Sequence, residues 1–190
     1  MGTTNLFVEL VVIGVGVLIW LVLFAFTILG FPPPDFRDGV LFASAIPLLA
    51  ITYVAGIIWD RIVDQLFEGI WVDNWRSDYF PTKIDYYNAR RTILTKSERL
   101  SELLEYGRSR MRICRAWVIN SILIGISLDT LLVVRFSDNN NLAAMLFTAT
   151  SVCMALSIGA WFAWAGMVKT EYRKVKEQSI FLQVEPTNDA

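Results

Sequence analysis

Four arginines fall within eight positions near the middle of the sequence: Arg108, Arg110, Arg112 and Arg115. Guanidinium groups pair with carboxylates and phosphates. Such a cluster is therefore typical of a nucleic-acid patch, a lipid-headgroup site or a membrane-topology signal. Arg108, Arg112 and Arg115 follow an i, i+4, i+7 spacing, which places them on one face of a helix. An almost uncharged stretch, 116–134, follows directly.

Two carboxylates lie at the end of another apolar stretch, in the same way that the arginines lie at the start of 116–134. Asp60 and Asp64 come directly after the uncharged residues 39–59. If the helices that carry these acids and the arginines are neighbours, the opposite charges meet at one depth, with Asp60 and Arg115 closest to the membrane. Anionic lipid headgroups are a further partner for the arginines. We predict a charge clasp, or a lipid-headgroup contact, formed by Asp60, Asp64, Arg108, Arg112 and Arg115.

Features that mark the common kinds of catalytic site are missing. The sequence has no histidine, and Cys114 and Cys153 form neither a metal-binding motif nor a disulfide framework. Phosphate-loop and nucleophile-elbow motifs are also missing. The segment 59–115 carries eleven basic and nine acidic residues, too small an excess for a nucleic-acid footprint. We expect no enzyme activity, no bound cofactor or metal, and no nucleic-acid partner.

Four apolar blocks must position these charged groups. They cover residues 5–31, 39–59, 116–134 and 141–168, and each carries at most one charge. About 20 residues suffice to cross the hydrocarbon core as a helix. The first block lacks the basic start and short apolar core of a cleaved signal peptide. The sequence thus predicts an all-α integral membrane protein with four transmembrane helices, at about 6–29, 39–59, 116–134 and 142–168.

The basic residues set the expected orientation. Eleven Lys and Arg lie between Trp59 and Arg115, and four lie in the tail 169–190, but each of the other two connections carries one. Cytoplasmic loops are rich in Lys and Arg. We therefore predict a plasma-membrane protein of the prokaryotic inner-membrane type, with both termini in the cytoplasm.

The connection between the second and third spans should form a helical hairpin in the cytoplasm. We expect the second helix to continue past Trp59 to about Trp71, and the stretch 73–94 to be irregular. Thr95 and Glu98 match a capping box, which would open a helix that enters the membrane as the third span. We expect the tail beyond Gln178 to be polar and mobile.

Polar groups inside the spans are candidate functional residues. Glu9 and Asp129 are acids within the first and third spans, close enough to their ends to reach an interface. Asn120, Ser127 and Thr130 follow an i, i+7, i+10 spacing on the third span. This polar stripe either lines a narrow path or hydrogen-bonds to neighbouring helices.

Small residues recur along the fourth span, where close helix packing requires them. This face either packs inside the chain or forms an interface between copies; it consists of Ser151, Ala155, Gly159, Ala163 and Gly166.

Three functions fit these features. The first is a membrane anchor or subunit that receives a soluble cytoplasmic protein on its hairpin. The second is a homo-oligomeric pore or channel, including a membrane effector of a stress or defence system. An enzyme or transporter is the third, and we expect it least. A ring of Asn120, Ser127 and Thr130 around an axis would favour the pore. An exposed patch around Trp71, Trp75, Tyr79 and Phe80 would favour the anchor.

Overall fold

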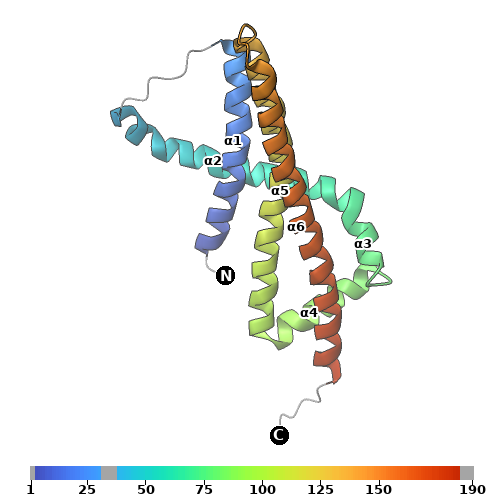
Figure 1. Cartoon of the computed structure of the whole chain (residues 1–190). Helices are drawn as coiled ribbons and strands as arrows, with labels where there is room; N and C mark the ends of the chain where they lie inside the picture. The colour runs from blue at the N-terminus through green and yellow to red at the C-terminus, as the bar shows by residue number, and fades with distance from the viewer. Residues whose placement is uncertain (1–2, 31–37, 185–190) are drawn as a thin grey trace.

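The protein is a bundle of long helices (Figure 1). The computed structural model describes residues 3–30 and 38–184, with side chains described for 6–30 and 45–182. No strand occurs in this described part, so the predicted all-helical fold is confirmed. The elements in order are α1 (Thr3–Leu29), α2 (Asp38–Phe67), the π-helix η1 (Glu68–Val72), α3 (Asp73–Ser77), α4 (Lys83–Lys96), α5 (Glu98–Arg135) and α6 (Leu142–Val184).

Four helical segments of the described chain are long and apolar enough to cross a membrane: Leu6–Leu29, Ala45–Ser77, Glu98–Arg135 and Leu142–Leu182. They indicate a multi-pass membrane protein. Much of their apolar surface faces outward, as a lipid-covered helix requires. The first of them ends where Gly30 adopts a φ of 69°, the left-handed conformation that glycine permits after a helix. The proline run at 32–34, which cannot continue a helix, lies outside the described residues.

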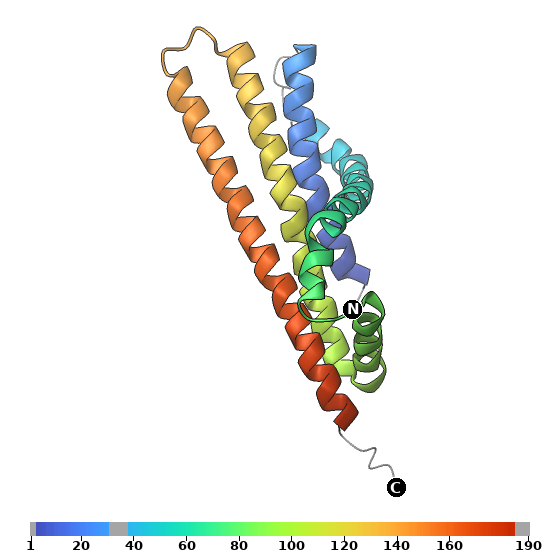
Figure 2. The same ribbon diagram turned by 90° about the vertical axis from the view of Figure 1, so that its right-hand side faces the viewer.

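α1, α5 and α6 run alongside one another, whereas α2 crosses α1 at a steep angle (Figures 1 and 2). Two glycines bring the backbones of α1 and α2 into direct contact. A Cβ atom on Gly14 would lie 1.8 Å from the carbonyl oxygen of Thr52, and one on Gly56 would lie 1.9 Å from that of Leu10. No other residue type fits at this crossing, so these glycines determine how α2 leaves the bundle.

Aromatic side chains join the turn after α2 to the middle of α6. The rings of Phe67 and Trp164 meet edge-on at 4.7 Å, as do those of Trp71 and Trp161. Trp75 extends the cluster and carries Lys169 over its ring at 4.9 Å. These rings pack against α6 instead of facing solvent, so the exposed aromatic patch that would have favoured the anchor is not present among the described residues.

The segment that we expected to be irregular, 73–94, is helical. α3 follows η1 directly, after the chain has turned away from the direction of α2, and α4 follows after a tight turn (Figure 1). Thr82 caps α4: its hydroxyl accepts from the Asp85 amide, and the Asp85 carboxylate accepts from the Thr82 amide. Tyr86, Ala89 and Ile93 are buried. The buried apolar face stabilises this helix. Polar and charged residues lie between its apolar residues in the sequence, so the sequence pattern did not reveal the helix.

The capping box expected at Thr95 and Glu98 is also wrong. α4 continues through Thr95, whose hydroxyl donates to the Arg91 carbonyl over 2.9 Å. Ser97 caps α5 instead, accepting from the Leu100 amide. The expected mobile tail beyond Gln178 is likewise wrong as far as residue 184, because α6 remains helical to Val184.

Candidate functional site

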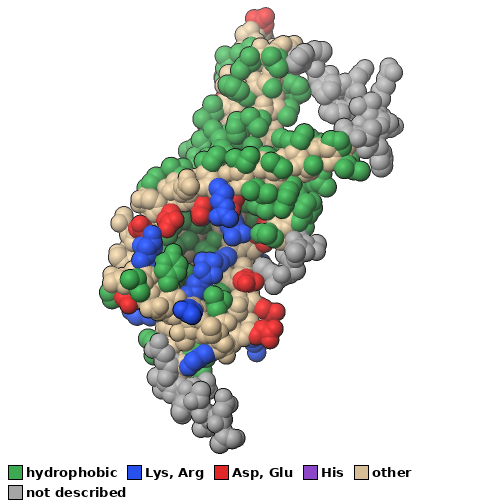
Figure 3. Space-filling view, turned by 180° about the vertical axis from the view of Figure 1, so that it is seen from behind, with side chains coloured by type: hydrophobic (Ala, Val, Ile, Leu, Met, Phe, Trp, Pro, Cys, Tyr) green, Lys and Arg blue, Asp and Glu red, His purple; other side chains and the backbone are tan. Residues whose placement is uncertain are grey.

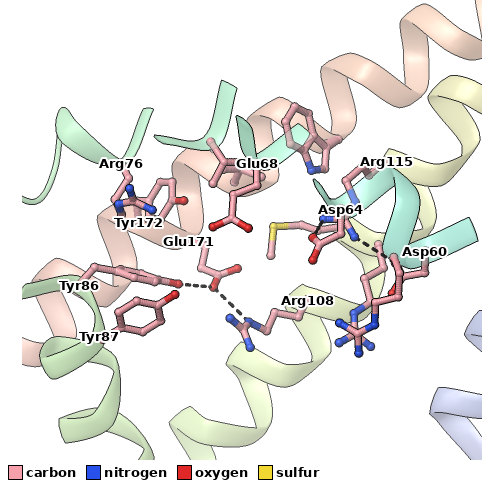
Figure 4. A pocket seen from close by; sticks show the side chains of 16 residues that line it. Asp60, Asp64, Glu68, Arg76, Tyr86, Tyr87, Arg108, Arg115, Glu171 and Tyr172 are labelled. Atoms are coloured by element: carbon pink, nitrogen blue, oxygen red, sulfur yellow. Dashed lines mark hydrogen bonds and ion pairs between the residues drawn. The ribbon is translucent and has the colours of Figure 1, made fainter. Parts of the chain in front are cut away.

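Arg115, on α5, bridges two carboxylates that α2 presents (Figure 4). Its Nη2 donates to Asp60 Oδ1 over 3.0 Å, and its Nη1 donates to Asp64 Oδ1. The side chains of Arg115 and Asp60 are 11% and 8% exposed, whereas that of Asp64 is 42% exposed. Asp60 lies on the same buried face of α2 as Val63 and Phe67, so packing of this face aims the carboxylates at α5.

A polar cavity of about 340 Å³ lies beside this clasp. Its walls come from α2, η1, α3, α4, α5 and α6, and they include five arginines and four carboxylates. Seen from behind, a hollow ringed by basic and acidic side chains opens on this face (Figure 3). The cavity lies where the apolar parts of α2, α5 and α6 give way to charged residues. Charge recognition is the chemistry that such a lining can perform.

Glu171, from α6, reaches into the cavity from the side opposite the clasp (Figure 4). Tyr86 donates its hydroxyl to Glu171 Oε1 over 3.3 Å, and Arg108 Nε lies 3.8 Å from the same oxygen. Among the described residues, Glu171 Oε2 is buried without a hydrogen-bond partner. Burial raises the pKa of Glu171 above its ordinary value, against the opposite pull of Arg108 and Arg90. This carboxyl is therefore held closer to its neutral form than an exposed glutamate.

The residues around Glu171 also respond to burial. Burial raises the pKa of the Tyr86 hydroxyl, and the nearby Glu171 carboxylate raises it further. Burial lowers the pKa of Arg90, and the positive charge of Arg108 lowers it further. A partly buried network that leaves polar atoms unpaired is costly.

The π-helix η1 places Glu68 on the cavity wall. Glu68 accepts from Lys83 over 3.2 Å, and Lys83 also lies 3.7 Å from Asp73. Asp73 in turn pairs with Arg76 at 2.7 Å. Single π turns inside α-helices are frequent at functional sites. These contacts join η1 and α3 to the start of α4.

The five residues of the predicted clasp do not form a single group. Arg115 pairs with both Asp60 and Asp64. Arg108 lies near Glu171 instead. Arg112 lines the same cavity but makes no hydrogen bond or ion pair with any residue that the structure describes.

Two of the three residues in the polar stripe of α5 are buried inside the chain. Asn120 is fully buried and donates through Nδ2 to the Ile13 carbonyl of α1 over 3.2 Å. Ser127 is buried, and Thr130 donates back to the carbonyl of Ile126. A Cβ atom on Gly16 would lie 2.3 Å from Asn120 Nδ2. The arrangement therefore shows interhelical packing at Asn120, not an open path.

The two acids of the spans differ in their surroundings. Asp129 Oδ2 accepts from Thr150 Oγ1 over 2.7 Å and so joins α5 to α6. Glu9 lies on the buried face of α1 and is 6% exposed. Neither lies at the cavity.

The small-residue face of α6 is exposed along its whole length: Ser151, Ala155, Gly159, Ala163 and Gly166. No atom outside its own helix backbone and chain neighbours lies within 4 Å of a Cβ built on Gly159 or Gly166. α6 uses a different face to pack on α5, and Ser157 on that face donates to the Val118 carbonyl over 3.0 Å. None of the residues whose side chains the structure describes covers this face.

An apolar groove of about 590 Å³ lies between α5 and α6, and it extends from the last turns of the fourth apolar block to the charged turns beyond that block. Leu103 from α5 and Phe162 from α6 line it and are 57% and 70% exposed. Arg110 and Lys174 add positive charge to its lining. The groove therefore combines accessible apolar surface with a basic edge.

Sequence reasoning missed Glu171 and Tyr86. Tyr86 lies in the stretch that we expected to be irregular, and Glu171 lies in the tail, 169–190, at a position for which we predicted no role. A usable signal was present on α6: Val168, Tyr172 and Val175 recur at helical spacing and are buried, which marks a packed helix rather than a tail.

The chain matches no family model, no curated protein and no solved structure. Among the described residues, no group of three or more His, Cys, Asp or Glu is arranged to hold a metal ion. The features that indicate a function are therefore the cavity, the groove and the distribution of charge.

Proposed function

We propose that this protein is a four-span membrane anchor that receives a soluble protein partner in the cytoplasm. The partner binds the polar half of the chain, which consists of α3, α4 and the charged turns of α5 and α6. Four long apolar helices support the membrane placement. α5 and α6 hold 38 and 43 residues, nearly twice the roughly 20 that a span requires. In this placement their remaining turns, together with α3 and α4, project beyond the bilayer as the helical hairpin.

The charge distribution supports the orientation. Basic residues concentrate in 59–115 and in 169–176, and they are sparse in the connections at the other end. Positive loops favour the cytoplasmic side. The cavity and the groove would then both lie on that side. The cavity would lie at the level of the lipid headgroups, and the groove would extend from there into the cytoplasm.

The groove between α5 and α6 is the observation that carries the proposal. Lipid does not cover apolar side chains that project beyond the bilayer, yet Leu103 is more than half exposed there. Exposed apolar grooves with a polar edge commonly receive an amphipathic helix. The basic side chains of Arg110 and Lys174 favour a partner segment with acidic residues beside its apolar face.

A charge placed in the groove tests this function. We expect the wild-type chain, purified from cells that carry it naturally, to retain one soluble protein at fixed stoichiometry. Leu103→Glu should lose that companion, whereas Ile84→Glu, a matched change at an exposed apolar site on α4, should retain it. Purification without any companion, or equal retention by both variants, would contradict the proposal.

A homo-oligomeric pore, including a stress or defence effector, is the second candidate. The exposed small-residue face of α6 favours it, because such faces let helices from separate copies approach closely. Gly159→Leu should then convert a discrete oligomer in detergent into monomers, as measured by light scattering. Ion conductance of the purified chain in planar bilayers distinguishes a pore from an anchor that oligomerises.

A further inference from the structure

Two arginines in the cavity lack the partners that their neighbours have. Arg61 projects from α2 and Arg112 from α5, and both line the cavity. Neither forms a hydrogen bond or an ion pair with any residue in the described part of the chain. Two positive groups thus face one cavity from opposing helices without a counter-charge of their own.

The carboxylates near these arginines are already engaged. Asp60 and Asp64 both bind Arg115, and Glu68 accepts from Lys83. Glu171 has its closest contacts on the far side of the cavity, with Tyr86 and Arg108. An external anion is the group that would complete the charge balance at Arg61 and Arg112.

The chemistry of arginine narrows the choice of anion. A guanidinium group presents a planar fork of donors that matches the oxygens of a phosphate. The cavity, at about 340 Å³, has room for a phosphate with a small substituent. Glu171 adds a carboxyl whose buried Oε2 has no partner among the described residues. A ligand hydroxyl or amine can donate to this oxygen.

We propose that this cavity binds a phosphate group through Arg61 and Arg112, with Glu171 contacting the substituent that the phosphate carries. Two sources share this chemistry: the headgroup of an anionic phospholipid, and a soluble phosphate compound. The lipid source rests on the proposed membrane placement, which puts the cavity at headgroup depth. Binding of a phosphate as such does not depend on that placement or on a protein partner.

Binding to the purified full chain in detergent tests the proposal. The probes are phosphatidylglycerol, a diacylglycerol with the same acyl chains but no phosphate, and inorganic pyrophosphate. We expect a phosphate-bearing probe to bind at least about tenfold more tightly than diacylglycerol, as two charge-assisted contacts allow. Native mass spectrometry measures lipid binding, and calorimetry measures pyrophosphate binding.

Charge-matched variants locate the site. R61Q/R112Q should lower affinity for the preferred probe by about tenfold or more. The control R99Q/R173Q replaces two exposed arginines that do not line the cavity. It should change the affinity for the same probe by less than about threefold. The single variants R61Q and R112Q retain one cavity arginine, so each should give a partial loss if the double variant unfolds.

The outcomes separate the sources. Cavity-dependent binding of phosphatidylglycerol alone identifies a lipid headgroup, and cavity-dependent binding of pyrophosphate identifies a soluble phosphate. Equal affinity for diacylglycerol and phosphatidylglycerol with no pyrophosphate binding would overturn the proposal. Equal losses in R61Q/R112Q and R99Q/R173Q would also overturn it, because they would show attraction to net charge alone. This binding assay does not require a protein partner, so failure of the phosphate proposal can be distinguished from failure of the proposed anchor function.

Discussion

At the scale of single residues, Arg115 and Asp60 form the most buried ion pair among the described residues. Both side chains are largely buried, and they neutralise each other at 3.0 Å. Asp64 makes the second contact from a position that is 42% exposed. Removing one member of a buried ion pair leaves an uncompensated charge, which costs about 3–5 kcal/mol, whereas exposed pairs contribute about 1 kcal/mol or less.

The two aspartates should therefore differ as mutation sites. Asp60→Asn should lower the free energy of unfolding by about 3 kcal/mol, and Asp64→Asn should lower it by about 1 kcal/mol or less. Thermal unfolding of the purified variants in one detergent measures both. An equal effect at the two positions would show that burial does not set the strength of the clasp.

Glu171 makes stability depend on pH. Burial raises the pKa of this carboxyl above 4.5, so the folded state holds the proton more tightly than the unfolded state. The stability that this group contributes is complete below about pH 4.5 and is lost as the pH rises through the folded pKa. Glu171→Gln removes this titration.

Unfolding temperatures of the wild type and Glu171→Gln, measured from about pH 4 to about pH 8, check this effect. The wild type should lose stability relative to the glutamine variant as the pH rises. Parallel curves over the whole range would mean that the carboxyl has no raised pKa.

At the scale of elements, the steep crossing of α1 and α2 depends on two glycines. Gly56→Ala should separate these helices and lower the unfolding temperature, because its Cβ would lie 1.9 Å from a backbone oxygen. Gly107→Ala, on α5 with nothing within 4 Å, should be neutral or stabilising by up to about 1 kcal/mol. If Gly56→Ala unfolds no earlier than Gly107→Ala, the close crossing is not present in the protein.

The long apolar helices could be predicted because each contains an extended stretch with almost no charge, a signal that needs no knowledge of neighbours. The contact of Arg115 with Asp60 could be expected once both were placed at the ends of adjacent apolar stretches. The position of Glu171 could not, because its meaning depends on α6 continuing as a helix and on α4 packing across it. The residues that reveal α4, Tyr86, Ala89 and Ile93, are spaced helically but interrupted by polar and charged side chains.

At the scale of the whole molecule, the chain consists of an apolar half and a polar half. α1, most of α2 and the adjoining parts of α5 and α6 are apolar and outward-facing. The cavity, the groove and α4 belong to the polar half. The proposed partner and a lipid source of the proposed phosphate both require the polar half to lie on one side of the bilayer, with the turn between α5 and α6 on the other.

Cysteine labelling across an intact membrane tests this division most directly. In a chain with Cys114→Ser and Cys153→Ala, a single cysteine is placed either at Ser137, in the turn between α5 and α6, or at Arg99, at the start of α5. Both positions are exposed. We predict that an impermeant thiol reagent labels Ser137→Cys in intact cells and labels Arg99→Cys only after permeabilisation. Labelling of both positions from outside, or of Arg99→Cys alone, would contradict the proposed topology.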